Sequence, residues 1–509
     1  VLPQIGGAPA VWTAAMLFFQ TVLIMGYLYA HLMNRYVPIK VQLLIHGVLW
    51  ALALLFLPLA VPALGGIVEG TNAVGQTLAI FAVGVGVPFA FLSANAPLIQ
   101  AWYAKSGRAD AHDPYYLYGA SNLGSLIALL GFPLLAEPLL GAMAISRMWS
   151  IGFVVLGLML ALAGLMAARG QVATVQPESI QPAENPDSHA PRAVQIAMWI
   201  VLSFLPSSMM LAVTTKVSTD MGAVPLLWVI PLSLYLVTFI LTFRRKELLP
   251  ARATEVLALI ALIGLAVLFS AITAGHLSPM RAALMVLGFF FVAYYFHARL
   301  YALRPSGRHL TLFYVIMSVG GALGGVFNSI LAPVIFDGLY EGLMTTAAGL
   351  ILVFANRLNF APDRQLKALF TGIIVVFVLS VAIAQMSGAS LLRISLLFAG
   401  GALIVIALLR KTPQLALIVA PIAIFAATQQ LVDHPIFRDR SFFGTHVVLE
   451  RDGFRLYANG TTIHGAERIR DLTRDEIEPL FYYHVNGPLA QLMHSSIGEK
   501  AKSVGIVGL

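Results

Sequence analysis

Amide and charged side chains interrupt several apolar segments of this sequence, and they are the residues best suited to hydrogen bonding or charge recognition there. Asn95, Asn122 and Asn328 lie among small residues, where an amide either joins two helices or contacts a solute that crosses the membrane. Lys216 and Asp220 are four residues apart, so a helix would bring them together as an ion pair. Each position is a candidate because polar groups inside a bilayer are costly.

Histidines supply a second set of candidates. His297 and Arg299 near the end of an apolar segment would either contact an anionic ligand or act as a helix-capping histidine and an arginine that extends to the bilayer surface. In the polar C-terminal stretch, His464, Tyr483 and His484 would either line a pocket or pack beneath a hairpin. No metal site is predicted there, because the two histidines lack a convincing third ligand.

The composition is that of an integral membrane protein, with 59% hydrophobic and 11% charged residues. A soluble domain carries about 25% charged residues. The chain has no cysteine, which excludes disulfides and thiolate metal sites, and its net charge of +8 gives no indication of nucleic-acid binding. Fourteen stretches have roughly the length of a bilayer span. They lie near 11–33, 41–61, 76–102, 115–140, 149–168, 195–213, 223–243, 253–274, 280–302, 309–335, 341–355, 366–385, 391–410 and 414–431.

The distribution of Lys and Arg predicts the orientation of these spans. Eighteen Lys and Arg residues lie in the odd-numbered connections, and only four lie in the even-numbered ones. Positive connections remain in the cytoplasm, so the odd connections are predicted to be cytoplasmic. With fourteen spans, the polar tail would then face the outside, although the last span, 414–431, contains Pro421 and could instead be re-entrant.

Two halves of the sequence resemble each other in one register. Tyr103-Ala104 with Gly107-Arg108 recurs as Tyr301-Ala302 with Gly307-Arg308, and Pro9-x-x-Trp12 recurs as Pro225-x-x-Trp228. The pattern predicts a parallel duplication of six helices, as in transporters built from two similar halves. The predicted divisions are a first repeat at 1–168, a polar linker at 169–194, a second repeat at 195–385, extra membrane helices at 386–432 and a C-terminal domain at 433–509. The repeat also predicts that the chain lacks a native first helix.

The C-terminal domain has the pattern of a small sheet followed by an α/β fold. Asp452-Gly453 and Asn459-Gly460 separate β-rich runs at 446–450 and 454–458, and such dipeptides favour tight hairpins. A short helix is predicted around Leu489–Ser495. Ser503–Leu509 is typical of a first buried strand that enters the glycine turn of a nucleotide-binding fold.

These motifs together resemble a family of bacterial proteins that fuse a major-facilitator-like membrane domain to a spermidine-synthase-like domain. The resemblance rests on long motifs that cover most of the chain. In the membrane part they are Gly6–Trp12, Phe18–Gln20, Asp113–Tyr118, Ser121–Ser125, Pro225–Trp228 and Gly320–Asn328; in the tail they are Asn459–Gly465, Tyr482–His484 and Asn486–Pro488.

The resemblance implies a small β-domain followed by a Rossmann-like aminopropyltransferase domain in a multi-pass protein of the bacterial inner membrane. The implied cofactor is decarboxylated S-adenosylmethionine, and the implied substrate is a polyamine or related amine. By position, His464 lies near a nucleoside-contacting glutamine of that family, and Tyr483-His484 matches a Tyr-His pair at the active-site mouth. The catalytic aspartate would lie beyond Leu509, so this stretch contains no predicted catalytic residue.

Two departures from the family pattern weaken the prediction of a diamine substrate. Val485 replaces the glutamate that normally follows the histidine, and Glu478-Pro479 replaces an acidic pair. Three hypotheses follow. The first is a membrane-bound aminopropyltransferase-like enzyme of polyamine metabolism, the second is a transporter of a small cationic or amphipathic metabolite, and the third treats the tail as a non-catalytic binding module. The sequence does not indicate the oligomeric state.

Overall fold

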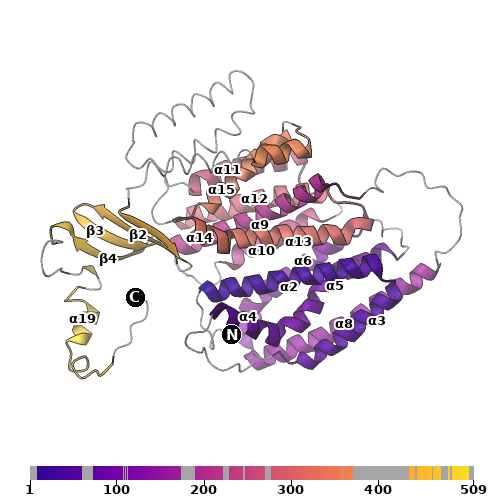
Figure 1. Cartoon of the computed structure of the whole chain (residues 1–509), viewed down its shortest axis with the longest axis horizontal. Coiled ribbons are helices and arrows are strands. Elements are labelled where there is room, and N and C mark those ends of the chain that lie inside the picture. The colour runs from indigo at the N-terminus through magenta and orange to yellow at the C-terminus, as the bar shows by residue number, and fades with distance from the viewer. Residues whose placement is uncertain are drawn as a thin grey trace, which may run out of the picture.

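The structure of the protein is a computed structural model, in which an all-helical bundle carries a small sheet at one end (Figure 1). It describes residues 9–59, 73–106, 108, 111, 113–173, 190–221, 228–244, 247–269, 277–357, 359–370, 435–441, 444–460, 462–471, 478, 480–481 and 484–503. Among these residues, nine helices are long and apolar enough to cross a membrane. They coincide with the first six predicted spans and with the eighth, ninth and tenth. The chain is therefore a multi-pass membrane protein by its architecture.

The remaining predicted spans differ from the expectation or lie outside the described residues. The seventh is the shorter apolar helix Val229–Thr242, and the eleventh is the 17-residue helix Glu341–Arg357. Of the twelfth, only the helical start at 362–370 is described. The predicted spans 391–410 and 414–431 lie outside the described residues, so the prediction of fourteen spans is not confirmed.

The first half of the bundle, which we define as α2 to α8, contains the helices before the polar linker. They are α2 (Pro9–Tyr36), α3 (Ile39–Ala53), α4 (Ala73–Phe81), α5 (Val87–Ala104), α6 (Tyr116–Gly131), α7 (Glu137–Leu139) and α8 (Ala142–Ala173). The second half, α9 to α15, follows the linker. Its helices are α9 (Ala193–Met221), α10 (Val229–Thr242), α11 (Ala251–Phe269), α12 (Pro279–Ala302), α13 (Leu310–Val326), α14 (Ala332–Ile335) and α15 (Glu341–Arg357).

Short irregular segments interrupt or extend these helices. Three-residue 3₁₀ turns occur at η1 (Leu54–Phe56) and η6 (Gly307–His309), and π-helical turns occur at η2 (Ala82–Gly86), η3 (Phe132–Ala136) and η7 (Phe327–Leu331). The last two π turns occupy similar places, because each follows a long helix and precedes a short proline-containing one. A π turn shifts the helical register and is frequent at functional sites.

Helix packing in the two halves follows one pattern. In the first half α2 packs on α5, and α3 packs on α5 and α8; in the second half α10 packs on α12, and α11 packs on α12 and α15. Between the halves, α2 packs on α13 and α10 packs on α6. The buried apolar side chains form one core in each half, and Tyr27 and Tyr115 of the first half join the core of the second.

Glycines permit the close contact between α9 and α13. A Cβ atom on Gly320 would lie 2.5 Å from the Ile200 carbonyl oxygen, and one on Gly324 would lie 2.9 Å from the Phe204 carbonyl oxygen. Small residues let membrane helices approach until their backbones touch. In contrast, Gly124 on α6 has open space at its Cβ position.

The C-terminal sheet is a four-stranded antiparallel meander in the order β1-β2-β3-β4. Its strands are β1 (Phe437–Ser441), β2 (Gly444–Arg451), β3 (Phe454–Asn459) and β4 (Thr462–Arg468), followed by a 3₁₀ turn η8 (Ile469–Asp471) and the helix α19 (Pro488–Met493). The two predicted strands and the predicted short helix are confirmed. The predicted Rossmann-like strand lies outside the described residues, except for its first residue, Ser503.

One of the two predicted hairpin turns is confirmed, and the other is displaced by one residue. Asp452 and Gly453 both have positive φ, +53° and +81°, and connect the paired residues Arg451 and Phe454. Asn459, however, is the last residue of β3, and the positive φ begins at Gly460. Asn459 is paired with Thr462 at the end of the ladder, whose register shifts by one residue between Tyr457 and Ala458, so the turn begins after Asn459.

Candidate functional site

Stacked tyrosines form the contact between the two halves of the bundle. The rings of Tyr118 on α6 and Tyr314 on α13 stack with their centroids 4.9 Å apart and their planes 18° apart. Tyr314 also contacts Tyr27 on α2 at 6.5 Å, and Tyr118 contacts Phe243 at the end of α10 at 5.0 Å. Tyr118 also contacts Phe239, and Tyr314 also contacts Tyr115, so each tyrosine contacts its partner and two further aromatic rings from the opposite half.

Polar side chains surround this aromatic contact. The hydroxyl of Tyr314 donates a hydrogen bond to the Gln100 side-chain oxygen on α5. His297 on α12 is fully buried and stacks on Phe239 of α10 with ring centroids 3.7 Å apart. Its Nδ1 atom lies 2.9 Å from the Thr238 hydroxyl, so the structure places this residue in the core of the bundle. His297 lies within α12, which continues to Ala302, and therefore does not cap that helix.

The three predicted asparagines are buried but do not gather at one point. Asn95 on α5 accepts a hydrogen bond from His46 on α3 at 3.2 Å if the imidazole Nε2 carries the proton. Asn122 donates to the Tyr118 carbonyl oxygen of its own helix at 2.8 Å. Asn328 in η7 donates to the Ser208 hydroxyl of α9 at 2.7 Å. Two of them thus join neighbouring helices, and Asn122 lies beside the stacked tyrosines.

The ion pair predicted at the end of the sixth span is present. The Lys216 ammonium lies 2.8 Å from a carboxylate oxygen of Asp220, and the Asp220 side chain is only 3% exposed. Both residues lie in the last two turns of α9, at the end of the bundle that carries the sheet. This pairing is of the ordinary i, i+4 kind along one helix face.

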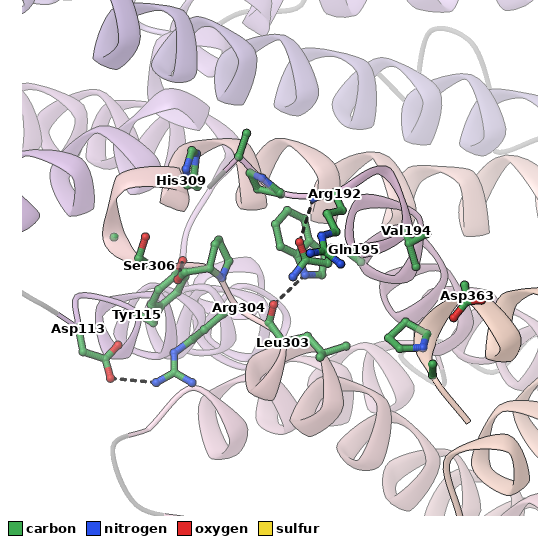
Figure 2. Close-up of a pocket in the computed structure, with 17 residues that line it drawn as sticks. Asp113, Tyr115, Arg192, Val194, Gln195, Leu303, Arg304, Ser306, His309 and Asp363 are labelled. Carbon is green, nitrogen blue, oxygen red and sulfur yellow. Dashed lines mark hydrogen bonds and ion pairs between the residues drawn. The ribbon is translucent and has the colours of Figure 1, made fainter. Parts of the chain in front are cut away.

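An open pocket of about 870 Å³ lies at the opposite end of the bundle, where the linker meets the loop after α12 (Figure 2). Its polar lining includes Asp113, Arg192, Gln195, Arg304 and Asp363. The positive and negative side chains are balanced in number, so the lining does not select for one sign of charge.

Arg304 joins the two halves at the edge of this pocket. Its guanidinium donates to the Asp113 carboxylate at 3.1 Å and lies 3.8 Å above the Tyr301 ring. Nearby, the Tyr115 hydroxyl donates to the Pro305 carbonyl oxygen at 2.8 Å. Asp113 and Tyr115 precede α6, whereas Arg304 and Pro305 follow α12, so these contacts join the two halves at this end of the bundle.

In the tail, the described candidates lie on different parts of the sheet domain. His464 lies on β4, with its ring 6.1 Å from that of Tyr457 on β3. His484 lies in the turn before α19, where its Nε2 atom is 3.0 Å from the Glu478 carboxylate. Tyr483 lies outside the described residues. Among the described residues, no three His, Asp or Glu side chains are arranged to hold a metal ion.

Acid is expected to loosen the contact between β4 and the segment before α19. Glu478 bonds His484 and receives a 2.6 Å hydrogen bond from Arg468, and these partners hold the pKa of its carboxyl below the usual value. A lowered folded-state pKa means that this stabilisation is complete above the ordinary glutamate range and is lost as the pH falls through the lowered value. The protection factors of the amides of residues 484–487, which are exchange rates corrected for the intrinsic pH dependence of amide exchange, should therefore fall on acidification. The Glu478→Gln variant should show low protection factors already at neutral pH, and wild-type protection factors that do not change with pH would contradict the expectation.

The structure also identifies site residues that the sequence analysis did not select. Tyr118 and Tyr314 were not singled out, because a tyrosine in an apolar helix is ordinary until its partner is known. Comparison with protein-family models and with curated proteins finds no match to this chain.

Proposed function

We propose that the helical part of this protein is a transporter-like bundle that moves a small organic cation, such as an amine or polyamine, between its two halves. The observation that carries the proposal is the reciprocal contact between the halves. Tyr27 contacts Tyr314 from α2, Phe243 contacts Tyr118 from the end of α10, and the two tyrosines stack on each other. The helix contacts are reciprocal in the same way, because α2 of the first half packs on α13 of the second, and α10 of the second half packs on α6 of the first.

This reciprocity supports the duplication inferred from the sequence. Two similar halves that meet at an aromatic contact can rock about it, which is how transporters with repeated halves expose a central site to one side at a time. The π turns η3 and η7, which occupy similar places in the two halves, agree with that proposal.

The side chains at the contact favour a cationic solute. Tyrosine rings attract ammonium and guanidinium groups through their π faces, and the attraction is strongest where water is excluded. Tyr314 and Tyr27 are buried, and Gln100 provides an amide oxygen at the same place. A carboxylate solute would gain none of these interactions.

Uptake into liposomes tests this proposal. Purified protein reconstituted into vesicles is expected to accumulate labelled putrescine, and unlabelled spermidine should compete while succinate should not. Vesicles with the protein inserted but without uptake of any labelled amine would contradict the proposal.

The second candidate function is an aminopropyltransferase-like activity in polyamine metabolism, with decarboxylated S-adenosylmethionine as donor. The β1–β4 meander followed by α19 favours it, because the family resemblance implies a small β-domain ahead of the Rossmann-like domain. Release of methylthioadenosine by the whole protein with putrescine as acceptor is the direct test. A protein that transports amines but releases no methylthioadenosine would be consistent with the transport function and would exclude the aminopropyltransferase function.

The side of the membrane on which the tail lies bears on that choice. The sheet contacts α15 at Glu341 and α9 at Thr219, and both lie at connections that hold few Lys or Arg. In a bacterial inner membrane, such connections are extracytoplasmic. We therefore propose an outward-facing tail. A reporter after Leu509 that fluoresces only in the cytoplasm should remain dark, and a bright signal would favour transfer from the cytoplasmic nucleoside.

A further inference from the structure

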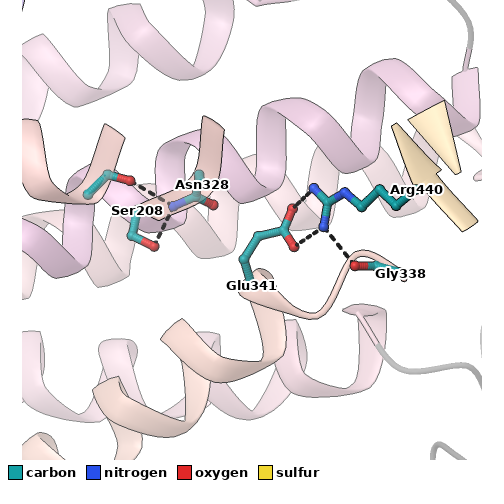
Figure 3. A network of polar contacts seen from close by, with 6 residues as sticks. Ser208, Asn328, Gly338, Glu341 and Arg440 are labelled. Atoms are coloured by element: carbon teal, nitrogen blue, oxygen red, sulfur yellow. Dashed lines mark hydrogen bonds and ion pairs between the residues drawn. The ribbon is translucent and has the colours of Figure 1, made fainter. Parts of the chain in front are cut away.

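We infer that Glu341 and the carbonyl group of Gly338 form a binding site for a small guanidinium or alkylammonium ion, which Arg440 of the sheet fills in this structure. The site lies at the start of α15, at the end of the bundle that carries the sheet (Figure 3). The inference deepens the proposed transport of organic cations by naming a place where such a cation binds.

The contacts of Arg440 resemble those of a bound ligand. Its two terminal nitrogens donate to the two carboxylate oxygens of Glu341, each at 2.9 Å. One of these nitrogens also donates to the Gly338 carbonyl oxygen at 2.7 Å. The side chains are almost fully enclosed, with 5% of Arg440 and 2% of Glu341 exposed. Paired hydrogen bonds of this kind are among the strongest in proteins.

The acceptors belong to the bundle, whereas the cation is delivered by a separate domain. Gly338 lies in the connection from α14 to α15, Glu341 is the first residue of α15, and Arg440 projects from β1 of the sheet. A buried carboxylate without a counter-ion is strongly unfavourable. Removal of the arginine side chain therefore leaves an enclosed acceptor that any cation of similar shape can satisfy.

A second, unused acceptor is linked to α15 through Ser208 and Thr345. The amide nitrogen of Asn328 donates to the Ser208 hydroxyl and to the Gly324 carbonyl oxygen. Because a carbonyl can only accept, this arrangement fixes the amide and leaves its oxygen buried and without a hydrogen-bond partner among the described residues. Figure 3 shows that oxygen on the side facing Glu341. A buried polar atom without a partner is rare and indicates a group that another molecule can satisfy.

One turn beyond the acceptor, hydrogen bonds join α15 to the bundle interior. Thr345 lies one turn after Glu341 on α15, and its hydroxyl is 2.7 Å from that of Ser208, which in turn bonds Asn328. One turn before Asn328, Gly325 faces the side chain of Gln20 on α2 in the other half. The site therefore lies on a helix that is hydrogen-bonded to α9 through Thr345 and Ser208, and a free cation can bind there only when the Arg440 side chain is absent.

Chemical rescue of the Arg440→Ala variant tests the inference. The variant is expected to melt at a lower temperature in detergent than the wild type, and ethylguanidinium at low, non-denaturing concentration should restore most of that loss. The double variant Arg440→Ala, Glu341→Gln is the matched control, because its acceptor is neutral, and it should show no recovery. The wild type should not respond either, since its site is filled.

Equal responses of the single and double variants, or no response of the single variant, would overturn the inference. If Arg440→Ala does not stay folded during purification, the single and double variants are compared instead by the yield of monodisperse protein purified with and without ethylguanidinium. These outcomes are independent of transport, because binding is measured without a gradient. Rescue without putrescine uptake would keep the site and reject the proposed function.

Discussion

Replacing Gly324 by leucine is expected to lower the free energy of unfolding by about 3 kcal/mol, because overpacking of a tight contact forces the helix backbones apart. A Cβ atom there would lie 2.9 Å from both the Phe204 carbonyl oxygen and the Ser208 amide nitrogen, and neither backbone atom can move without displacing α9. The measurement is the melting temperature of detergent-solubilised protein, followed by loss of the monodisperse peak in size-exclusion chromatography.

Two glycines provide matched controls for this prediction. Gly321 lies three residues before Gly324 on α13, and Gly124 lies on α6 at the place in the first half that corresponds to Gly324. Both have open space at the Cβ position. Leucine at either position should leave the melting temperature nearly unchanged. A Gly324→Leu protein as stable as these controls would show that α9 and α13 do not pack as described.

Replacing Tyr314 by alanine is expected to reduce amine uptake roughly tenfold or more, because a desolvated cation–π contact contributes about 2 kcal/mol and each 1.4 kcal/mol is tenfold in affinity. The substitution removes the stack with Tyr118 and leaves the Gln100 oxygen without its donor. Initial rates of putrescine uptake in vesicles, normalised to inserted protein, provide the measurement.

Two further substitutions separate the role of the ring from a general loss of packing. Tyr314→Phe keeps the ring and should retain most of the uptake. Tyr116→Ala removes a tyrosine that contacts Tyr103 at the pocket end of α6, outside the stack, and should change uptake little. Full uptake by a correctly inserted Tyr314→Ala protein would exclude the tyrosine stack from the solute path.

The positions of the helices could be predicted from the sequence, because a bilayer requires long apolar segments and these are visible in one dimension. The Asp452-Gly453 turn was equally local, since two successive residues with positive φ need particular side chains. The Asn459-Gly460 turn was misplaced by one residue, because its position depends on how β3 pairs with β4 rather than on the dipeptide alone.

The site residues were less predictable, because they are defined by partners far away in the chain. Glu341 and Arg440 are 99 residues apart, and neither residue type is unusual in its own segment. The one indication in the sequence was that Glu341 is a charged residue at the start of an apolar helix, directly after the connection that contains Gly338. Asn328 is a candidate from the sequence and is buried in the structure, but its unused oxygen is apparent only from the positions of Gly324 and Ser208.

Two kinds of helix contact, one between backbones and one between side chains, determine how the molecule can deform. α9 and α13 interlock through backbone atoms at glycines, so they must move as one piece. The contact between the halves consists instead of side chains, among them the stacked rings of Tyr118 and Tyr314 and the ion pair of Arg304 with Asp113. In the transport that we propose, the halves would move against each other at this contact of side chains. The sheet is bound to α15 through Arg440, so it would move together with the second half in such a motion.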